Sequence, residues 1–118
     1  VMNSCNPIRR QATVMLERAG KQHGAPIWSA AAKLLARPGG TNTEVNLGHI
    51  SRIAEQGQAI FVPGKVLGAG VLDKKLVIGA FSFSESARSK LISAGGTPLS
   101  IREFLAKYPK GSGVRLVQ

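Results

Sequence analysis

The stretch from Gly64 to Gly96, GKVLGAGVLDKKLVIGAFSFSESARSKLISAGG, decides the fold. Its first part is rich in glycine and is expected to form a loop. The apolar run Leu76–Phe83 has the β-branched and aromatic residues typical of a strand. Ser84 can cap the helix that follows, and Gly95-Gly96 is expected to end that helix. The stretch therefore predicts a loop, a strand and a helix in succession.

Two helices are predicted before this stretch and one after it. Proline near the first helical position and apolar residues at helical spacing place the first two over 7–19 and 26–37. A capping box at Ser100 and Glu103 begins the last helix, and Pro109 ends it. Further strands are predicted over 59–62 and 114–117, and a short strand that passes into a turn over 45–53.

This order of elements predicts an α+β fold: one compact domain, residues 1–118, with N-terminal helices and irregular β-β-α units. The helical part is expected to span about 6–37, and the mixed α/β part about 44–118. A chain of 118 residues can bury a modest core without disulfides. Because the chain has one cysteine and two well-separated histidines, neither an intramolecular disulfide nor a metal site is expected.

The chain carries a large excess of positive charge. Sixteen Lys and Arg residues against six Asp and Glu residues give a net charge of +10. Residues 1–40 hold six basic residues and one acidic residue, and residues 97–118 hold four and one, so both ends are basic. This charge predicts a polyanionic partner. No run is apolar enough to span a bilayer, and no helix concentrates its cations opposite a broad apolar face, so nucleic acid is favoured over a membrane.

No constellation of catalytic residues is recognisable. The glycine-rich segment 64–70 is not followed by the Gly-Lys-Ser/Thr of a nucleotide-binding loop, and Asp73 occupies the position of the third glycine in a dinucleotide-binding fingerprint. The six acidic residues are scattered singly, which does not suggest paired general acid and base catalysis. A small enzyme acting on a phosphorylated substrate is therefore the least favoured alternative, and no cofactor is expected.

Two features leave alternative interpretations open. Gly68 and Gly70 allow either a bend or close packing within the protein, or close approach of the backbone to RNA with Lys65 beside it. The one tryptophan, Trp28, is predicted to be a core or edge residue rather than a platform for base stacking. Since aromatic residues make up only 5% of the chain, contact with the shape and backbone of folded RNA is favoured over the reading of single-stranded bases.

The same stretch also resembles the signature of a known family. The matching positions are Lys65-Val66-Leu67, Gly68, Gly70, Phe83-Ser84, Ala87, Leu91 and Gly95-Gly96. Their spacing resembles that of large-subunit ribosomal protein fifteen of bacteria and its counterpart, protein eighteen of archaea and eukaryotes. Matches at Asn6-Pro7, Trp28, Glu44–Leu47 and Gly111–Arg115 extend the resemblance over nearly the whole chain, and the archaeal branch fits best. Gly39-Gly40-Thr41 departs from the family, which is more basic there.

The resemblance implies a structural constituent of the large ribosomal subunit, in the cytoplasm, that binds folded large-subunit ribosomal RNA and neighbouring ribosomal proteins and supports translation. It implies no catalytic residue, cofactor, small-molecule substrate or membrane partner. An RNA-binding regulator or assembly factor outside the ribosome is the alternative. The residues expected to contact phosphates are Arg9, Arg10, Arg37, Arg52, Lys65, Lys74, Lys75, Lys110 and Arg115, with Gly68 and Gly70 permitting close approach.

Overall fold

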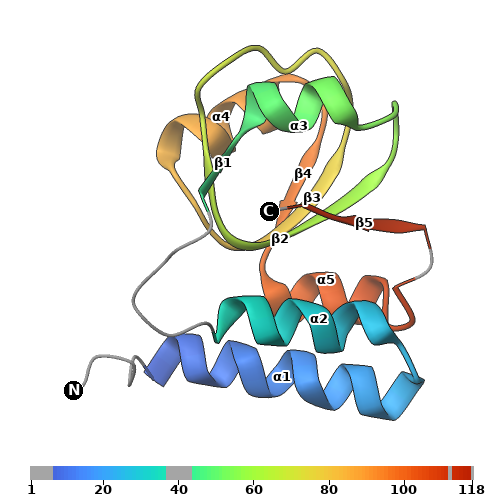
Figure 1. Ribbon diagram of the computed structural model, residues 1–118. Coiled ribbons are helices and arrows are strands. Elements are labelled where there is room, and N and C mark those ends of the chain that lie inside the picture. The colour runs from blue at the N-terminus through green and yellow to red at the C-terminus, as the bar shows by residue number, and fades with distance from the viewer. Residues whose placement is uncertain (1–6, 37–43, 112, 118) are drawn as a thin grey trace.

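The computed structural model describes residues 7–36, 44–111 and 113–117 (Figure 1). Within these ranges the chain forms α1 (Pro7–His23), α2 (Pro26–Leu35), β1 (Glu44–Asn46), α3 (Leu47–Ile53), β2 (Ala59–Leu67), β3 (Val77–Phe83), α4 (Glu85–Ser93), β4 (Thr97–Leu99), α5 (Ile101–Lys107) and β5 (Val114–Leu116). This arrangement confirms the α+β prediction. Asn6 of the Asn6-Pro7 match and the segment Gly39-Gly40-Thr41 lie outside the described residues.

The five strands form one parallel sheet in the order β1-β2-β3-β4, and β5 also pairs with β2. Both β5 and β1 lie along the edge of β2 that faces away from β3. β5 pairs with Ala59–Phe61, and β1 pairs with Lys65–Leu67. Between these two segments the register of β2 with β3 shifts, at Pro63 and Gly64. The bulge lets the strand predicted to end at Val62 continue to Leu67.

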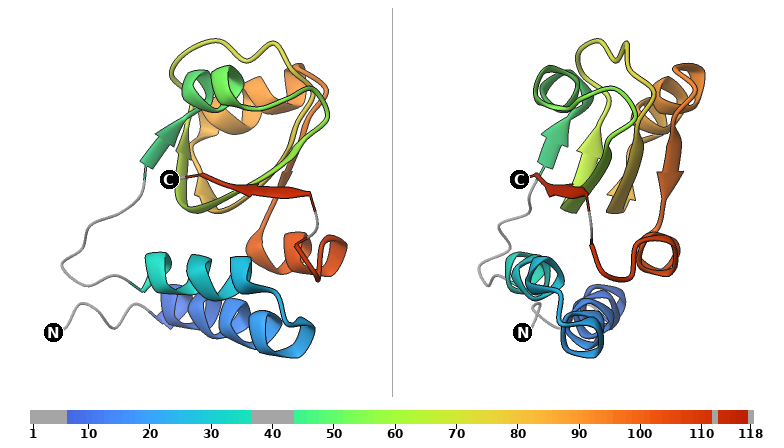
Figure 2. Two further views of the ribbon diagram at one scale, coloured as in Figure 1. Left: turned by 45° about the vertical axis from the view of Figure 1, so that its right-hand side comes forward. Right: turned by 90° about the vertical axis from the view of Figure 1, so that its right-hand side faces the viewer.

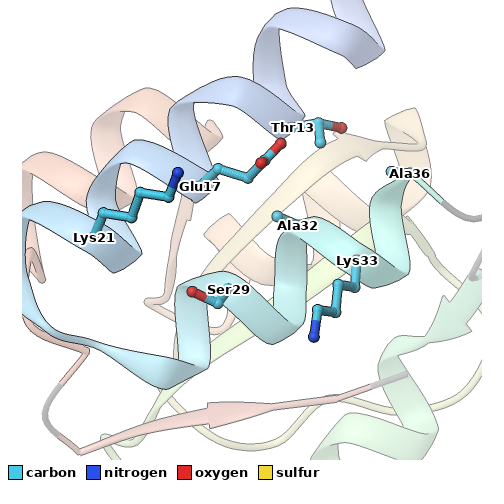
Figure 3. Close-up of a pocket in the computed structure, with 7 residues that line it drawn as sticks. All are labelled: Thr13, Glu17, Lys21, Ser29, Ala32, Lys33 and Ala36. Carbon is cyan, nitrogen blue, oxygen red and sulfur yellow. The ribbon is translucent and has the colours of Figure 1, made fainter.

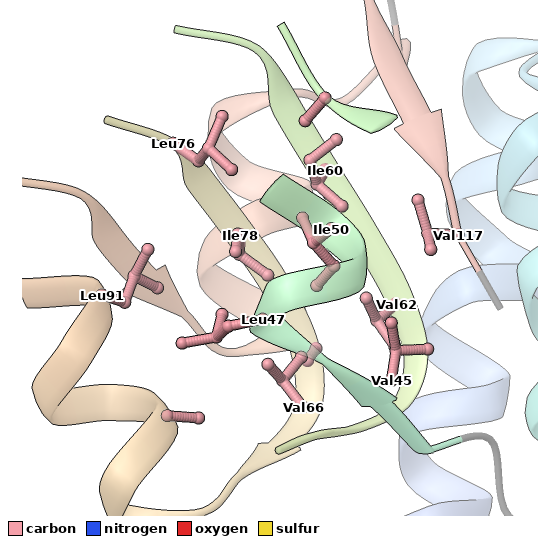
Figure 4. Packing of buried hydrophobic residues seen from close by; sticks show 13 residues of the cluster. Val45, Leu47, Ile50, Ile60, Val62, Val66, Leu76, Ile78, Leu91 and Val117 are labelled. Atoms are coloured by element: carbon pink, nitrogen blue, oxygen red, sulfur yellow. The ribbon is translucent and has the colours of Figure 1, made fainter. Parts of the chain in front are cut away.

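Helices cover both faces of the sheet (Figures 1 and 2). On one face α3 and α4 pack over a cluster of aliphatic side chains (Figure 4). Its members include Val45, Leu47, Ile50, Ile60, Val62, Val66, Leu76, Ile78, Leu91 and Val117. On the other face α1, α2 and α5 pack over a cluster that contains most of the aromatic rings. A parallel sheet buried on both faces explains why β2 and β3 are apolar without strict alternation.

Trp28 lies at the centre of the second cluster and is fully buried. Its ring makes edge contacts with Phe61 and Phe104, at centroid distances of 5.2 and 5.9 Å. Its Nε1–H donates a 2.9 Å hydrogen bond to the carbonyl oxygen of Pro109. The prediction that Trp28 is a core or edge residue is therefore confirmed, and a fully buried indole cannot stack on a base without unfolding the core.

The first helix is longer than predicted. It continues past Ala19 and through Gly20 to His23, and Gly20 lies where α1 packs closely against α2. A Cβ atom at Gly20 would lie only 2.5 Å from Oγ of Ser29. Glycine at this position therefore serves helix packing rather than helix termination, and the chain turns at Gly24, where φ is +59°.

Two further elements differ from the prediction. Residues 45–53 were predicted as a short strand that passes into a turn, but the strand ends at Asn46 and Leu47–Ile53 form helix α3, with Leu47 and Ile50 fully buried. Here the helical spacing of the apolar residues was the decisive pattern. Strand β4 was not predicted, since it has only three residues and contains Pro98. Proline is tolerated there because β4 is an edge strand of the sheet.

The predicted caps of the last two helices are confirmed. Oγ of Ser84 accepts a bond from the N–H of Ala87. In α5 the N–H of Glu103 donates to Oγ of Ser100, and the N–H of Ser100 donates to the Glu103 carboxylate. That backbone bond lowers the pKa of Glu103 below its ordinary value. The carboxylate therefore stabilises the fold above its unfolded pKa, and this contribution is lost as the pH falls through the lower folded value.

Candidate nucleic-acid interface

A shallow pocket between α1 and α2 offers no catalytic machinery (Figure 3). Its volume is about 410 Å³, and it is lined by Thr13, Glu17, Lys21, Ser29, Ala32, Lys33 and Ala36. The lining has one carboxylate and neither histidine nor cysteine. Among the residues that the structure describes, no group of three His, Cys, Asp or Glu side chains is placed to hold a metal ion. No described helix is long and apolar enough to cross a membrane.

The residues predicted to contact phosphate are distributed over several elements. Six of them are exposed: Arg10 on α1, Arg52 on α3, Lys65 on β2, Lys75 before β3, Lys110 after α5 and Arg115 on β5. Lys74 is half-buried. Arg37 lies outside the described residues, and the side chain of Arg9 belongs to the part of α1 whose side chains are not described.

Three of the predicted cations gather at the C-terminal end of α3. Arg52 is in the last turn of the helix itself. Nη1 of Arg115 donates a 3.1 Å hydrogen bond to the carbonyl oxygen of Ile53. Lys74 approaches the same turn from the loop before β3. The last carbonyl oxygens of a helix carry partial negative charge and have no intrahelical partner, so they attract cations from distant parts of the chain.

Lys74 and Arg115 are held in different ways at this helix end. Nζ of Lys74 donates to the carbonyl oxygens of Ser51 and Ala54, at 2.5 and 2.6 Å, so its ammonium group caps α3. Arg115 donates to the carbonyl of Ile53 through one nitrogen of a guanidinium that carries five N–H donors. Its remaining donors leave it better suited than Lys74 to bind a phosphate. Both phosphate contacts stay predictions.

The neighbouring lysines Lys74 and Lys75 should therefore respond differently to truncation. Lys74→Ala is expected to lower the free energy of unfolding by about 1.5–3 kcal/mol, because it removes charge-assisted bonds to carbonyls of α3. Lys75→Ala, at an exposed side chain, is expected to change it by less than about 0.5 kcal/mol. Urea unfolding followed by circular dichroism measures both. Equal stability of the two variants would contradict the capping role of Lys74.

The glycines of the loop after β2 have packing roles within the protein. Gly68 is buried against the start of α4, where a Cβ atom would overlap Oγ of Ser86 and lie 2.8 Å from the backbone nitrogen of Ala87. Gly70 has φ of +93°, and a Cβ atom there would lie 2.6 Å from Cα of Gly48. These contacts support the interpretation of close packing within the protein. The approach of this loop to RNA stays a prediction.

Lys90 is a residue of this region that the sequence did not single out. It lies in the last turn of α4, and its Nζ donates to the carbonyl oxygens of Gly68 and Gly70 at 2.6 and 3.1 Å. The partners are about twenty residues apart in sequence, so no local pattern connects them. The spacing of the two glycines was the only sequence signal that this loop is held in a particular conformation.

Comparison with known proteins gives a consistent result. The model of a family described as ribosomal proteins 50S-L15 and 50S-L18e, together with a 60S counterpart, matches residues 27–98. Over 114 residues the chain is 43% identical to the large ribosomal subunit protein eL18 of Methanococcus maripaludis, covering 97% of this chain and 95% of that protein. It is 43% identical over 113 residues to eL18 of Methanoregula boonei, covering 96% and 93%. Identity to eL18 of Pyrobaculum aerophilum is 38% over 118 residues, covering 98% and 97%.

Proposed function

The chain belongs to the family of the ribosomal proteins L15 and L18e, and from this membership we propose that it binds folded large-subunit ribosomal RNA as a structural constituent of the large subunit. The observation that carries the proposal is similarity over nearly the full length of relatives named eL18. The family consists of ribosomal constituents rather than enzymes, in agreement with the absence of a catalytic constellation from the sequence.

The charge of the protein and the burial of its aromatic rings support contact between its cations and the RNA backbone rather than stacking on RNA bases. The net charge of +10 would repel itself unless counter-ions or phosphates surrounded it. Exposed cations come from elements far apart in sequence, among them Arg10, Arg52 and Lys65. The rings of Trp28 and Phe104 are fully buried. Such a surface suits the shape and the sugar–phosphate backbone of a folded RNA.

Sedimentation of ribosomes tests this proposal against a regulator or assembly factor that acts outside the ribosome. Native cell extract is washed at high salt and separated on a sucrose gradient, and the protein is quantified by mass spectrometry in each fraction. We expect about one copy per large subunit after the wash, because a tightly bound constituent keeps its site occupied when the free protein is diluted away. Release of the protein to the top of the gradient would favour a transient factor and overturn the proposal.

A further inference from the structure

Three consecutive carbonyl groups of the loop after β2 are turned toward the protein. The oxygens of Gly68 and Gly70 accept bonds from Nζ of Lys90 at 2.6 and 3.1 Å. The oxygen of Ala69, between them, accepts a 2.9 Å bond from the backbone N–H of Gly48. These three consecutive carbonyl oxygens are therefore hydrogen-bonded within the molecule, on the side of the loop that faces α3 and α4.

Because the peptide unit is planar, the direction of each carbonyl group determines the direction of the N–H group of the next residue. In a trans peptide the N–H group points opposite to the carbonyl of the preceding residue. The N–H groups of Ala69, Gly70 and Val71 are therefore directed away from the groups that bind those carbonyls. None of the three has a hydrogen-bond acceptor among the residues that the structure describes. All three residues are exposed, and Val71 is 77% exposed.

Lys90 binds two of these three carbonyls, and the backbone N–H of Gly48 binds the third. The peptides that Lys90 holds adjoin Gly68 and Gly70, and glycine tolerates backbone conformations on both sides of φ = 0. Without the ammonium group those peptides could rotate and present their carbonyl oxygens to solvent, where they would repel an anion. With it, the carbonyl dipoles are satisfied and a positive charge lies beside the loop. The exposed ammonium group of Lys65, near the end of β2, adds a second positive charge to this part of the chain.

We propose that the backbone N–H groups of Ala69, Gly70 and Val71 bind a phosphate of the RNA backbone, and that Lys90 is the positioning residue that aims those of Ala69 and Val71. Successive backbone N–H groups form anion-binding sites when their carbonyls are turned away, and a nearby cation strengthens them. This inference rests on the proposed function, because it assigns a particular contact to the same RNA partner. In this proposal Gly68 and Gly70 contribute to RNA binding indirectly: their close packing against α4 and α3 keeps the loop in the conformation that exposes its N–H groups.

The test compares Lys90→Ala with Lys107→Ala, which removes the same charge from an exposed position on α5. The probe is deproteinised large-subunit ribosomal RNA of Methanococcus maripaludis, whose own eL18 is 43% identical to this chain. We expect Lys90→Ala to bind about tenfold more weakly than Lys107→Ala, the effect of losing one well-placed contact to a charged group. Lys90→Arg keeps the charge and the donors and is expected to bind within about threefold of the wild type.

Hydrogen exchange read by mass spectrometry reports on the amides themselves. In the wild type and in Lys107→Ala, bound RNA is expected to slow exchange at residues 69–71 by at least about tenfold. In Lys90→Ala this protection should be lost at Ala69 and Val71, whose N–H groups Lys90 orients. If the wild type binds the RNA but these amides exchange at the same rate as in the free protein, the phosphate site is refuted and the proposed function stands. If the wild type does not bind the RNA at all, both fail.

Discussion

The affinity of this protein for deproteinised large-subunit ribosomal RNA, in the absence of the rest of the subunit, is expected to fall by about three to four orders of magnitude as the salt concentration rises from about 50 to about 200 mM. This magnitude assumes that about six to eight cations contact phosphates, and each such contact releases condensed counter-ions from the RNA. The structure leaves enough exposed cations for it, since six of the nine predicted contacts are exposed. Filter binding at a series of salt concentrations gives the slope of log K against log salt.

A double variant tests whether the named residues produce that slope. Lys65→Ala combined with Lys75→Ala removes two exposed cations and is expected to flatten the slope by about 1.4–1.8, since each contact contributes about 0.7–0.9. The matched control combines Arg18→Ala and Lys21→Ala, two exposed cations of α1 that are not among the predicted contacts. An unchanged slope in the first variant would show that Lys65 and Lys75 do not contact phosphate. An equally flattened slope in the control would show that the effect comes from the loss of net charge and not from these two positions.

Local signals of the sequence predicted the second half of the fold best. The cap at Ser84 and the capping box at Ser100 each involve hydrogen bonds between residues three positions apart. A short segment of sequence therefore contains all the residues needed to predict them. The parallel pairing of the strands could not be predicted in this way. It depends on contacts such as that of β2 with β5, which joins residues more than fifty positions apart, and short strands such as β4 are recognised only from their partners.

At the candidate interface, too, the sequence predicted individual residues better than contacts between residues far apart in the chain. Lys65 and Lys75 were predicted to contact phosphate, and both side chains are exposed. The engagement of Lys74 with α3 was not predicted, because residues 45–53 were predicted as a short strand that passes into a turn, which has no row of free carbonyls to attract a cation. Lys90 was missed for a related reason, since its role depends on carbonyl groups rather than on side chains.

Trp28→Ala is expected to lower the free energy of unfolding by about 3–5 kcal/mol. The substitution leaves a cavity between Phe61 and Phe104, and it removes the donor to the carbonyl oxygen of Pro109 that ties α2 to the segment after α5. A loss of this size is a large part of the roughly 5–15 kcal/mol typical of a small domain. Because Trp28 is the only tryptophan, unfolding is followed by circular dichroism rather than by fluorescence.

Trp28→Phe separates a core role from a role in base stacking. Phenylalanine keeps an aromatic face but cannot donate a hydrogen bond to Pro109, so we expect a smaller loss of about 1–3 kcal/mol. At temperatures where this variant is fully folded, its affinity for RNA should equal that of the wild type, because the indole is fully buried. Unchanged stability combined with weakened RNA binding would instead place Trp28 at the interface, and would require that α2 move away from the sheet when RNA binds.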